Sequence, residues 1–104
     1  MKTTDRSIES VTLNYSKSLL ERGFSKGHLR TFKPFHSTGL CFTNRIILGL
    51  VISGNLEVQT SLSVNHFVSD EEFLLPANLH FQVSAGVLGA VMFVARQKFT
   101  KTFL

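Results

Sequence analysis

The chain has a single cysteine, no long apolar run and no apolar segment near its N-terminus, and each of these features excludes a class of protein. It holds one cysteine, Cys41, so an internal disulfide is impossible, as is usual for proteins of a reducing cytoplasm. Its longest apolar runs, 46–52 and 87–95, are far shorter than the roughly 20 residues that a membrane-spanning helix needs. No apolar segment follows the first charged residues, so we expect no cleaved secretory signal. These absences predict a cytoplasmic protein that does not enter a membrane.

Low-complexity tracts are also absent, whereas 43% of the residues are hydrophobic and ten are phenylalanine. We expect residues 1–104 to form one globular domain, with residues 1–10 as a loosely ordered N-terminal arm. A domain of this size buries only about 65% of its surface, and a homodimer is therefore our default expectation.

Basic residues gather towards the two ends of the chain. Residues 1–45 hold eight Lys or Arg against three acids, residues 46–95 hold none against four acids, and three more basic residues follow. If the two ends lie side by side, they form one basic face that attracts phosphate or other anions. The alternative is an ordinary solvated surface, because no basic residues are consecutive. Nucleic-acid binding is not predicted, since the phenylalanines mostly lie in apolar contexts.

Short β-strands explain most of the hydrophobic pattern. We expect one over 27–35 that ends at Pro34, and others over 40–44, 46–52, 56–65 as a hairpin turning between 59 and 66, 73–75, 81–83 and 91–95. The run 46–52 is apolar on both faces, which is typical of a strand buried between two layers. Strands with turn signals every eight to twelve residues predict an all-β barrel or sandwich.

Several segments allow two interpretations or a simple turn. Alternation over Val11–Tyr15 favours a short strand, whereas Ser16–Gly23 would form one or two helical turns with Ser16 as cap and Gly23 as stop. Residues 53–55 form a tight reversal or a bulge. Turns are expected at 70–72 and between Gly86 and Gly89.

Two motifs together resemble the cupin superfamily. The first is Leu50–Val58, and the second, eleven residues later, is Asp70–Asn78 with its Pro-Ala-Asn step. The resemblance covers roughly residues 26–96. It implies an all-β fold, a small cupin-type jelly-roll barrel, preceded here by the short N-terminal arm.

Metal-binding cupins carry histidines and a carboxylate at positions that here are occupied differently. The resemblance places two histidine positions within 40–43, the carboxylate near Ile47 and the last histidine at Phe81, with His80 one residue away. A shift of one residue turns a side chain to the other face of a strand. A zinc site from His36, His80 and Cys41 is the alternative, but isolated histidines usually bond to backbone or water. We expect no metal and no cofactor.

Within the superfamily, 51–56 and 76–81 look most like the pyrimidine/purine nucleoside phosphorylases, small cupins without metal. That family has an arginine in its last strand, here Arg96, and the resemblance implies phosphate as a second substrate. This sequence departs from the family because 45–49 lacks a carboxylate and extra residues lie around 86–89.

The chain is also similar to the sensory half of arabinose-type regulators, which bind a small ligand and dimerise. It would then be a stand-alone sensor or dimerisation module. Six phenylalanines would line an apolar pocket, or would fill the barrel interior: Phe32, Phe35, Phe42, Phe73, Phe81 and Phe93.

Taken together, the sequence predicts a metal-free cupin domain that binds a small organic or anionic ligand in the barrel mouth. The candidate ligand-binding residues are Cys41, Phe42, Thr43, His80, Phe81 and Arg96. No catalytic residue is assigned, because Cys41 has no partner base and the acids at 70–72 are typical of a solvated turn. Whether the protein is an enzyme stays open.

Overall fold

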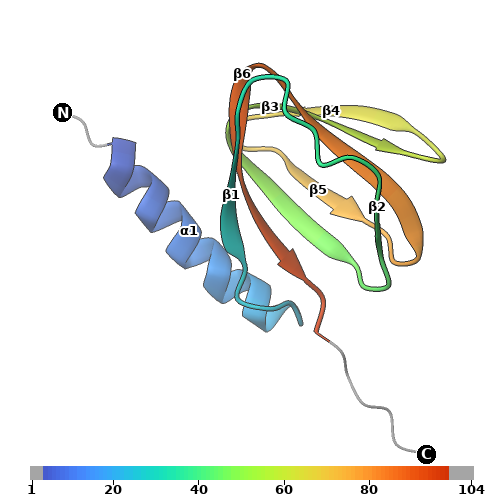
Figure 1. The fold of residues 1–104 in the computed structure, drawn as a ribbon. Helices are drawn as coiled ribbons and strands as arrows, with labels where there is room; N and C mark the ends of the chain where they lie inside the picture. The colour runs from blue at the N-terminus through green and yellow to red at the C-terminus, as the bar shows by residue number, and fades with distance from the viewer. Residues whose placement is uncertain (1–3, 99–104) are drawn as a thin grey trace, which may run out of the picture.

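The computed structural model describes the backbone of residues 4–98 and the side chains of residues 13–98. Its elements follow in the order α1 (Thr4–Glu21), β1 (His28–Phe32), β2 (Cys41–Thr43), β3 (Ile47–Thr60), β4 (Val64–Val68), β5 (Glu72–Leu75) and β6 (Leu79–Arg96) (Figure 1). Every strand pairing is antiparallel. The prediction of an all-β jelly-roll barrel is confirmed, with one helix added before it.

Two long strands, β3 and β6, form the spine of the barrel. They pair with each other along almost their whole length, from Ile47 opposite Arg96 to Thr60 opposite Phe81. The free edge of β6 pairs with β1 and β2, and the free edge of β3 pairs with β4 and β5. The four short strands therefore lie as two pairs on either side of one bent ribbon.

Side chains on the two faces of this ribbon enter different cores. The inner face holds a cluster that includes Val51, Phe81 and Met92, and the outer face holds a second cluster that includes Leu48 and Phe93. Because successive side chains of a strand point to opposite faces, β3 supplies both clusters. This explains why 46–52 is apolar throughout, as expected for a strand between two layers.

The helix α1 lies outside the barrel, beside β1 and β6 (Figure 1), and covers the outer cluster through Leu19, which is fully buried. It corrects the expected loose arm over 1–10, of which residues 1–3 lie outside the described part, and the expected strand over Val11–Tyr15. The physical reason is tertiary packing, because the segment buries side chains against β3 and β6 as a helix. The alternation of apolar and polar residues within the segment does not reveal this burial. No helix within residues 4–98 is long and apolar enough to cross a membrane.

The end of α1 is where the sequence placed it. Gly23 has a φ of 88°, and the amides of Gly23 and Phe24 donate to the carbonyls of Leu20 and Leu19. This is the Schellman arrangement, and the buried Leu19 and Phe24 add its usual apolar contact. Ser16 is not the cap but lies within the helix, where its hydroxyl donates to the carbonyl of Lys26.

A polar clamp joins α1 to β5. The hydroxyl of Tyr15 donates to Glu72 at 2.5 Å, and Arg22 pairs with the same carboxylate at 3.3 Å. Burial, followed by the bond to Glu72, raises the pKa of Tyr15 far above its usual range. Burial works against ionisation of Glu72, but its bonds to Tyr15 and Arg22 outweigh it and lower the pKa of this carboxyl.

Two segments with turn signals are irregularities inside long strands. Residues 53–55 form a bulge, which is one of the two expected alternatives, since the register with β6 shifts on either side of Ser53 and Gly54. The expected turn between Gly86 and Gly89 is wrong, because β6 continues through it. At this crossing a Cβ on Gly54, whose φ is 78°, would lie 2.1 Å from the carbonyl oxygen of Gly89. Glycine thus lets two bent strands remain paired where the sequence signals a reversal.

The other turns follow expectation. The β3–β4 hairpin turns between Thr60 and Val64, and the acidic turn ends where β5 begins at Glu72. Asp70 there has a φ of 74°, and its amide donates to the carbonyl of Val51. The strand expected over 73–75 buries Phe73 and Leu75 but exposes Leu74, because the segment alternates instead of being buried throughout.

Candidate ligand-binding cavity

A partly enclosed cavity of about 680 Å³ lies inside the barrel. Its inner wall is apolar and comes from β3, β5 and β6, with Ile47, Phe73, Leu75, Phe81, Val83 and Met92. The barrel is therefore not filled solid by its phenylalanines, which was one of the two expectations for them. A cavity of this size is within the range of small-molecule sites.

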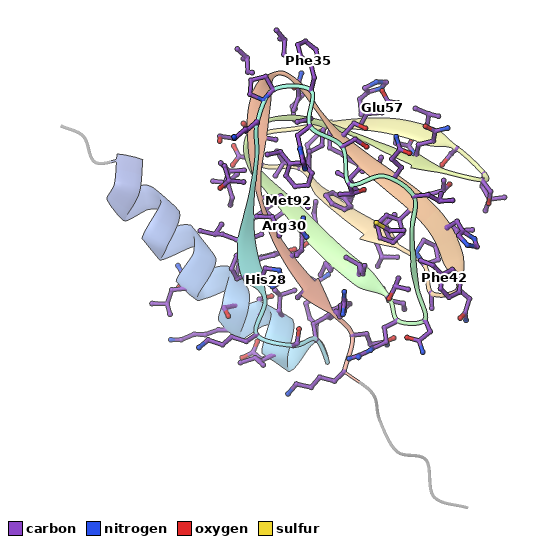
Figure 2. All side chains as sticks on the ribbon, viewed as in Figure 1. His28, Arg30, Phe35, Phe42, Glu57 and Met92 are labelled. Atoms are coloured by element: carbon purple, nitrogen blue, oxygen red, sulfur yellow. The ribbon has the colours of Figure 1, made fainter. Side chains whose placement is uncertain are left out.

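Strand pairing determines which polar side chains face this cavity. In the β1–β6 pair, Arg30 lies opposite Met92 and His28 opposite Val94. Both β1 residues share a face with Phe32, which is 3% exposed in the inner cluster. The Arg30 guanidinium carbon lies 5.5 Å above the centre of the Phe32 ring, which is a cation–π distance. Figure 2 shows Arg30 and Met92 between β1 and the strands β3 and β5, with His28 below them near the end of α1.

Two further arginines join Arg30 around the cavity. Arg96 ends β6 opposite Ile47, and Arg45 belongs to the loop between β2 and β3. The segment after α1 is anchored beside Arg96, since the Ser25 amide donates to the Arg96 carbonyl at 2.8 Å and the Arg96 amide donates to Ser25 Oγ at 3.2 Å. The segment after α1 and the end of β6 thus lie side by side, and Arg30, Arg45 and Arg96 line the same cavity.

None of the described residues that line the cavity is Asp or Glu. Three guanidinium groups, those of Arg30 and Arg96 on solvent-exposed residues, create a positive potential at a site with an apolar wall. This arrangement can bind an oxyanion through charge-assisted hydrogen bonds. None of its described lining residues offers a carboxylate as general base, and His28 is the lining side chain of a type that commonly acts as general acid or base.

Smaller polar groups of the wall are bonded to the protein itself. Thr38 Oγ1 accepts from the Val83 amide at 3.1 Å and donates to the Gly39 carbonyl at 2.8 Å. The Cys41 thiol donates to the Gly39 carbonyl at 3.5 Å, and Thr43 Oγ1 accepts from the Arg45 amide at 3.2 Å. These groups hold the β2 side of the cavity in shape.

Five of the six candidate residues from the sequence line the cavity: Cys41, Phe42, Thr43, Phe81 and Arg96. Their part in binding stays a prediction. His80 does not line it, because β2 pairs with β6 so that Cys41 faces Phe81 and Phe42 faces His80. The Phe42 ring lies 4.9 Å from the His80 ring, and 55% of the Phe42 surface is exposed. Phe42 therefore borders the cavity from its exposed side, at β2, beside which Figure 2 labels it.

Four residues that line the cavity were not among those predicted from the sequence: His28, Arg30, Arg45 and Met92. The alternation of His28, Arg30 and Phe32 was a usable signal, because a buried aromatic on one strand face places its neighbours two residues away on the same face. This alternation does not identify the partner strand, because β1 pairs with a segment about sixty residues later in the chain.

The phenylalanines divide between the two faces. Three line the cavity: Phe42, Phe73 and Phe81. Phe32 is buried in the same inner cluster, whereas Phe93 belongs to the outer cluster beneath α1. Phe35 is 71% exposed and lies at the opposite end of the molecule from His28 (Figure 2). The expectation of six pocket-lining phenylalanines is therefore wrong for Phe35 and Phe93.

The residues present do not fit a metal of the kind that cupins hold. Within residues 13–98 no three His, Cys, Asp or Glu side chains gather as a metal site would require. The zinc alternative needs His36, His80 and Cys41 together, but His80 faces away from the cavity and the His36 ring lies against Phe32. Phe81, not an imidazole, occupies the inner position.

Comparison with known proteins bears on the fold alone. No family model and no curated protein matches the sequence. Among solved structures, the Schizosaccharomyces pombe Cnp3 cupin domain has a TM-score of 0.66 at 12% identity, covering 76% of this chain and 55% of that one. A Cupin 2 conserved barrel domain protein from Salinispora arenicola has a TM-score of 0.63 at 16% identity, covering 69% and 61%.

Oxalate decarboxylase from B. subtilis has a TM-score of 0.64 at 15% identity, covering 71% of this chain and 21% of that one. The chain thus spans about half to two thirds of the first two structures and about a fifth of the third. At such low sequence identities a similar fold does not imply a similar activity. The spine of β3 and β6, the inner cavity and these neighbours together show that the chain has the cupin fold.

Proposed function

We propose that this chain is a small-molecule-binding cupin domain that holds an anionic ligand in the barrel mouth without a metal. One observation carries the proposal: a cavity of about 680 Å³ has three arginines and no acid among its described lining residues. Guanidinium groups bind oxyanions through charge-assisted hydrogen bonds, and several like charges at one site attract anions to it. A bound oxyanion would accept hydrogen bonds from these arginines.

Thermal unfolding with a panel of small carboxylates, phosphates and sulfonates tests this proposal. A ligand at one hundred times its Kd stabilises the folded state by about 2.7 kcal/mol, which raises Tm measurably. Arg96→Gln should abolish the shift, whereas Lys98→Gln, an exposed cation outside the cavity, should preserve it. A panel in which no anion raises Tm would refute the proposal.

The metal-free part has its own test. Elemental analysis of the purified protein should find no zinc, iron or manganese near one equivalent, because the inner position that a ligand would need holds Phe81. If the protein held one equivalent of any of these metals, and a chelator both removed the metal and lowered Tm, the metal-free proposal would be contradicted.

Nucleoside phosphorolysis is a second candidate, favoured by Arg96 on the cavity wall. An arginine fork would bind phosphate and orient it towards a nucleoside. Incubating a panel of nucleosides with phosphate and measuring free base decides it, since an enzyme of this class releases base only when phosphate is present. Intact nucleosides throughout would remove this candidate while leaving the binding proposal in place. The sensor role, the homodimer and the cytoplasmic location stay predictions.

A further inference from the structure

We infer that the ligand of this cavity is an amphiphilic anion, an apolar chain or ring that carries one oxyanion head such as a carboxylate or a phosphate ester. The inference rests on the proposed function, because it names the ligand class of the same cavity. It is carried by the division of the lining into a cationic part and an apolar part.

The cationic part comes from three separate segments that the fold brings together. Arg30 projects from β1, Arg45 from the β2–β3 loop and Arg96 from the end of β6. On the inner face of the β1–β6 pair, Arg30, His28 and Arg96 follow one another along the strands, at positions paired with or next to Met92 and Val94. One oxyanion can accept hydrogen bonds from several guanidinium groups, and their planar forks suit a carboxylate or a phosphate.

The apolar part begins directly beside these cations. Met92 is the cross-strand partner of Arg30, and Ile47 is the partner of Arg96. Deeper in the cavity the wall continues with Phe73 and Phe81, both less than 10% exposed. A ligand whose head binds the arginines would therefore place its body against apolar side chains.

The inner wall is poorly suited to a polyhydroxylated ligand. Its polar groups on Thr38, Cys41 and Thr43 already take part in hydrogen bonds within the protein, as does Ser25 Oγ. Sugar hydroxyls buried against Phe73 and Phe81 would lose bonds to water without replacement, which weakens binding roughly 5-fold to 150-fold for each unpaired group. Apolar ligand atoms lose nothing of this kind, and they gain from leaving water.

The apolar interior also extends beyond the first cavity. A second cavity of about 220 Å³ shares Phe73 and Leu75 with the first, and its other lining residues include the apolar Val58, Phe67 and Leu79 and the polar Thr60, Ser63 and Asn65. The Phe67 and Phe73 rings pack 5.2 Å apart. Phe73 and Leu75 thus form an apolar wall that both cavities share.

Calorimetric titration with matched probes tests the inference. Sodium octanoate and octyl phosphate should bind, and shortening the chain from octanoate to butanoate should weaken binding by about fourfold per methylene removed. Octanol has the same chain without the charge, and inorganic phosphate has a charge without the chain, so each should bind at least tenfold more weakly than octanoate. If only octyl phosphate binds, the head is a phosphate ester; if only octanoate binds, it is a carboxylate.

Two variants connect binding to the arginines of the cavity. Arg30→Gln should weaken octanoate binding roughly tenfold to a hundredfold, as expected for a charge-assisted hydrogen bond. Lys33→Gln removes an exposed cation that follows β1 and does not line the cavity, and it should leave binding unchanged. Octanol binding as tightly as octanoate, or equal effects of the two variants, would overturn the inference. Phosphate binding that depends on Arg30 without any effect of chain length would overturn it too, yet would leave the proposed function standing.

Discussion

The helix α1 should be an integral part of the domain, and Leu19→Ala tests this most sharply. Leu19 is fully buried against Phe24, Leu48, Phe93 and Ala95. Truncating a buried leucine costs about 2–5 kcal/mol in lost burial and in the cavity that remains. Since α1 can shift towards the sheet and fill part of this space, we expect the lower half of the range. For a domain of about 100 residues, each kcal/mol lowers Tm by roughly 4–8 °C, so Tm should fall by about 8–28 °C.

The neighbouring leucine supplies the matched control. Leu20 is 45% exposed on the same helix, so Leu20→Ala removes the same atoms with far less burial and should change Tm by only a few degrees, as roughly 0.5 kcal/mol or less would. Both variants are measured by thermal unfolding followed by circular dichroism. Equal shifts for Leu19→Ala and Leu20→Ala would refute the docking of α1 on the outer face.

Two further predictions concern the bulge and the polar clamp. Gly54→Ala should destabilise the protein by roughly 2–5 kcal/mol in urea unfolding, because its φ of 78° strains an L-residue and a Cβ would meet the Gly89 carbonyl oxygen. Gly23→Ala is the control, since Gly23 has a similar φ but open space around it, and it should cost about 1–2 kcal/mol. Equal losses of stability in the two variants would contradict the close approach of Gly54 to Gly89. The lowered pKa of Glu72 makes it stabilising above its ordinary pKa, and this contribution is lost as pH falls through the folded-state pKa. Wild type should therefore be more stable than Glu72→Gln at pH 7 by up to about 1 kcal/mol, because the Arg22–Glu72 pair is partly exposed. This difference in stability should shrink towards pH 3. A difference that does not depend on pH would contradict the clamp.

The sequence predicted strands well because their residues alternate or are bounded by turn signals. Pro34, Pro76 and Gly23 mark ends of segments, and each acts locally through its own backbone restrictions. The bulge at Gly54 and the bend near Gly89 were harder, since a glycine permits a reversal and a bulge alike. Whether a reversal or a bulge forms depends on whether β3 and β6 stay paired on both sides of the glycine.

The helix was missed for a related reason. Its described inner side contributes Tyr15 and Leu19, and the residues beside them include Asn14, Ser16 and Ser18, which are poor helix formers. Burial against β3 and β6 outweighs that propensity, and such burial is invisible in the segment itself. The cavity cations were likewise hidden, because Arg30 and Arg96 come to line the same cavity only through the pairing of β1 with β6.

Occupation of the cavity is the central claim, and one methionine can report it directly. The chain has two methionines, of which Met92 lines the cavity opposite Arg30. Spectra of protein labelled with ¹³C at the methionine methyl groups contain few signals, and Met92→Leu identifies the one from Met92. Titration with octanoate should move that signal saturably, with the same Kd as calorimetry. Binding by calorimetry that leaves the Met92 methyl signal unmoved would place the ligand elsewhere and contradict the account.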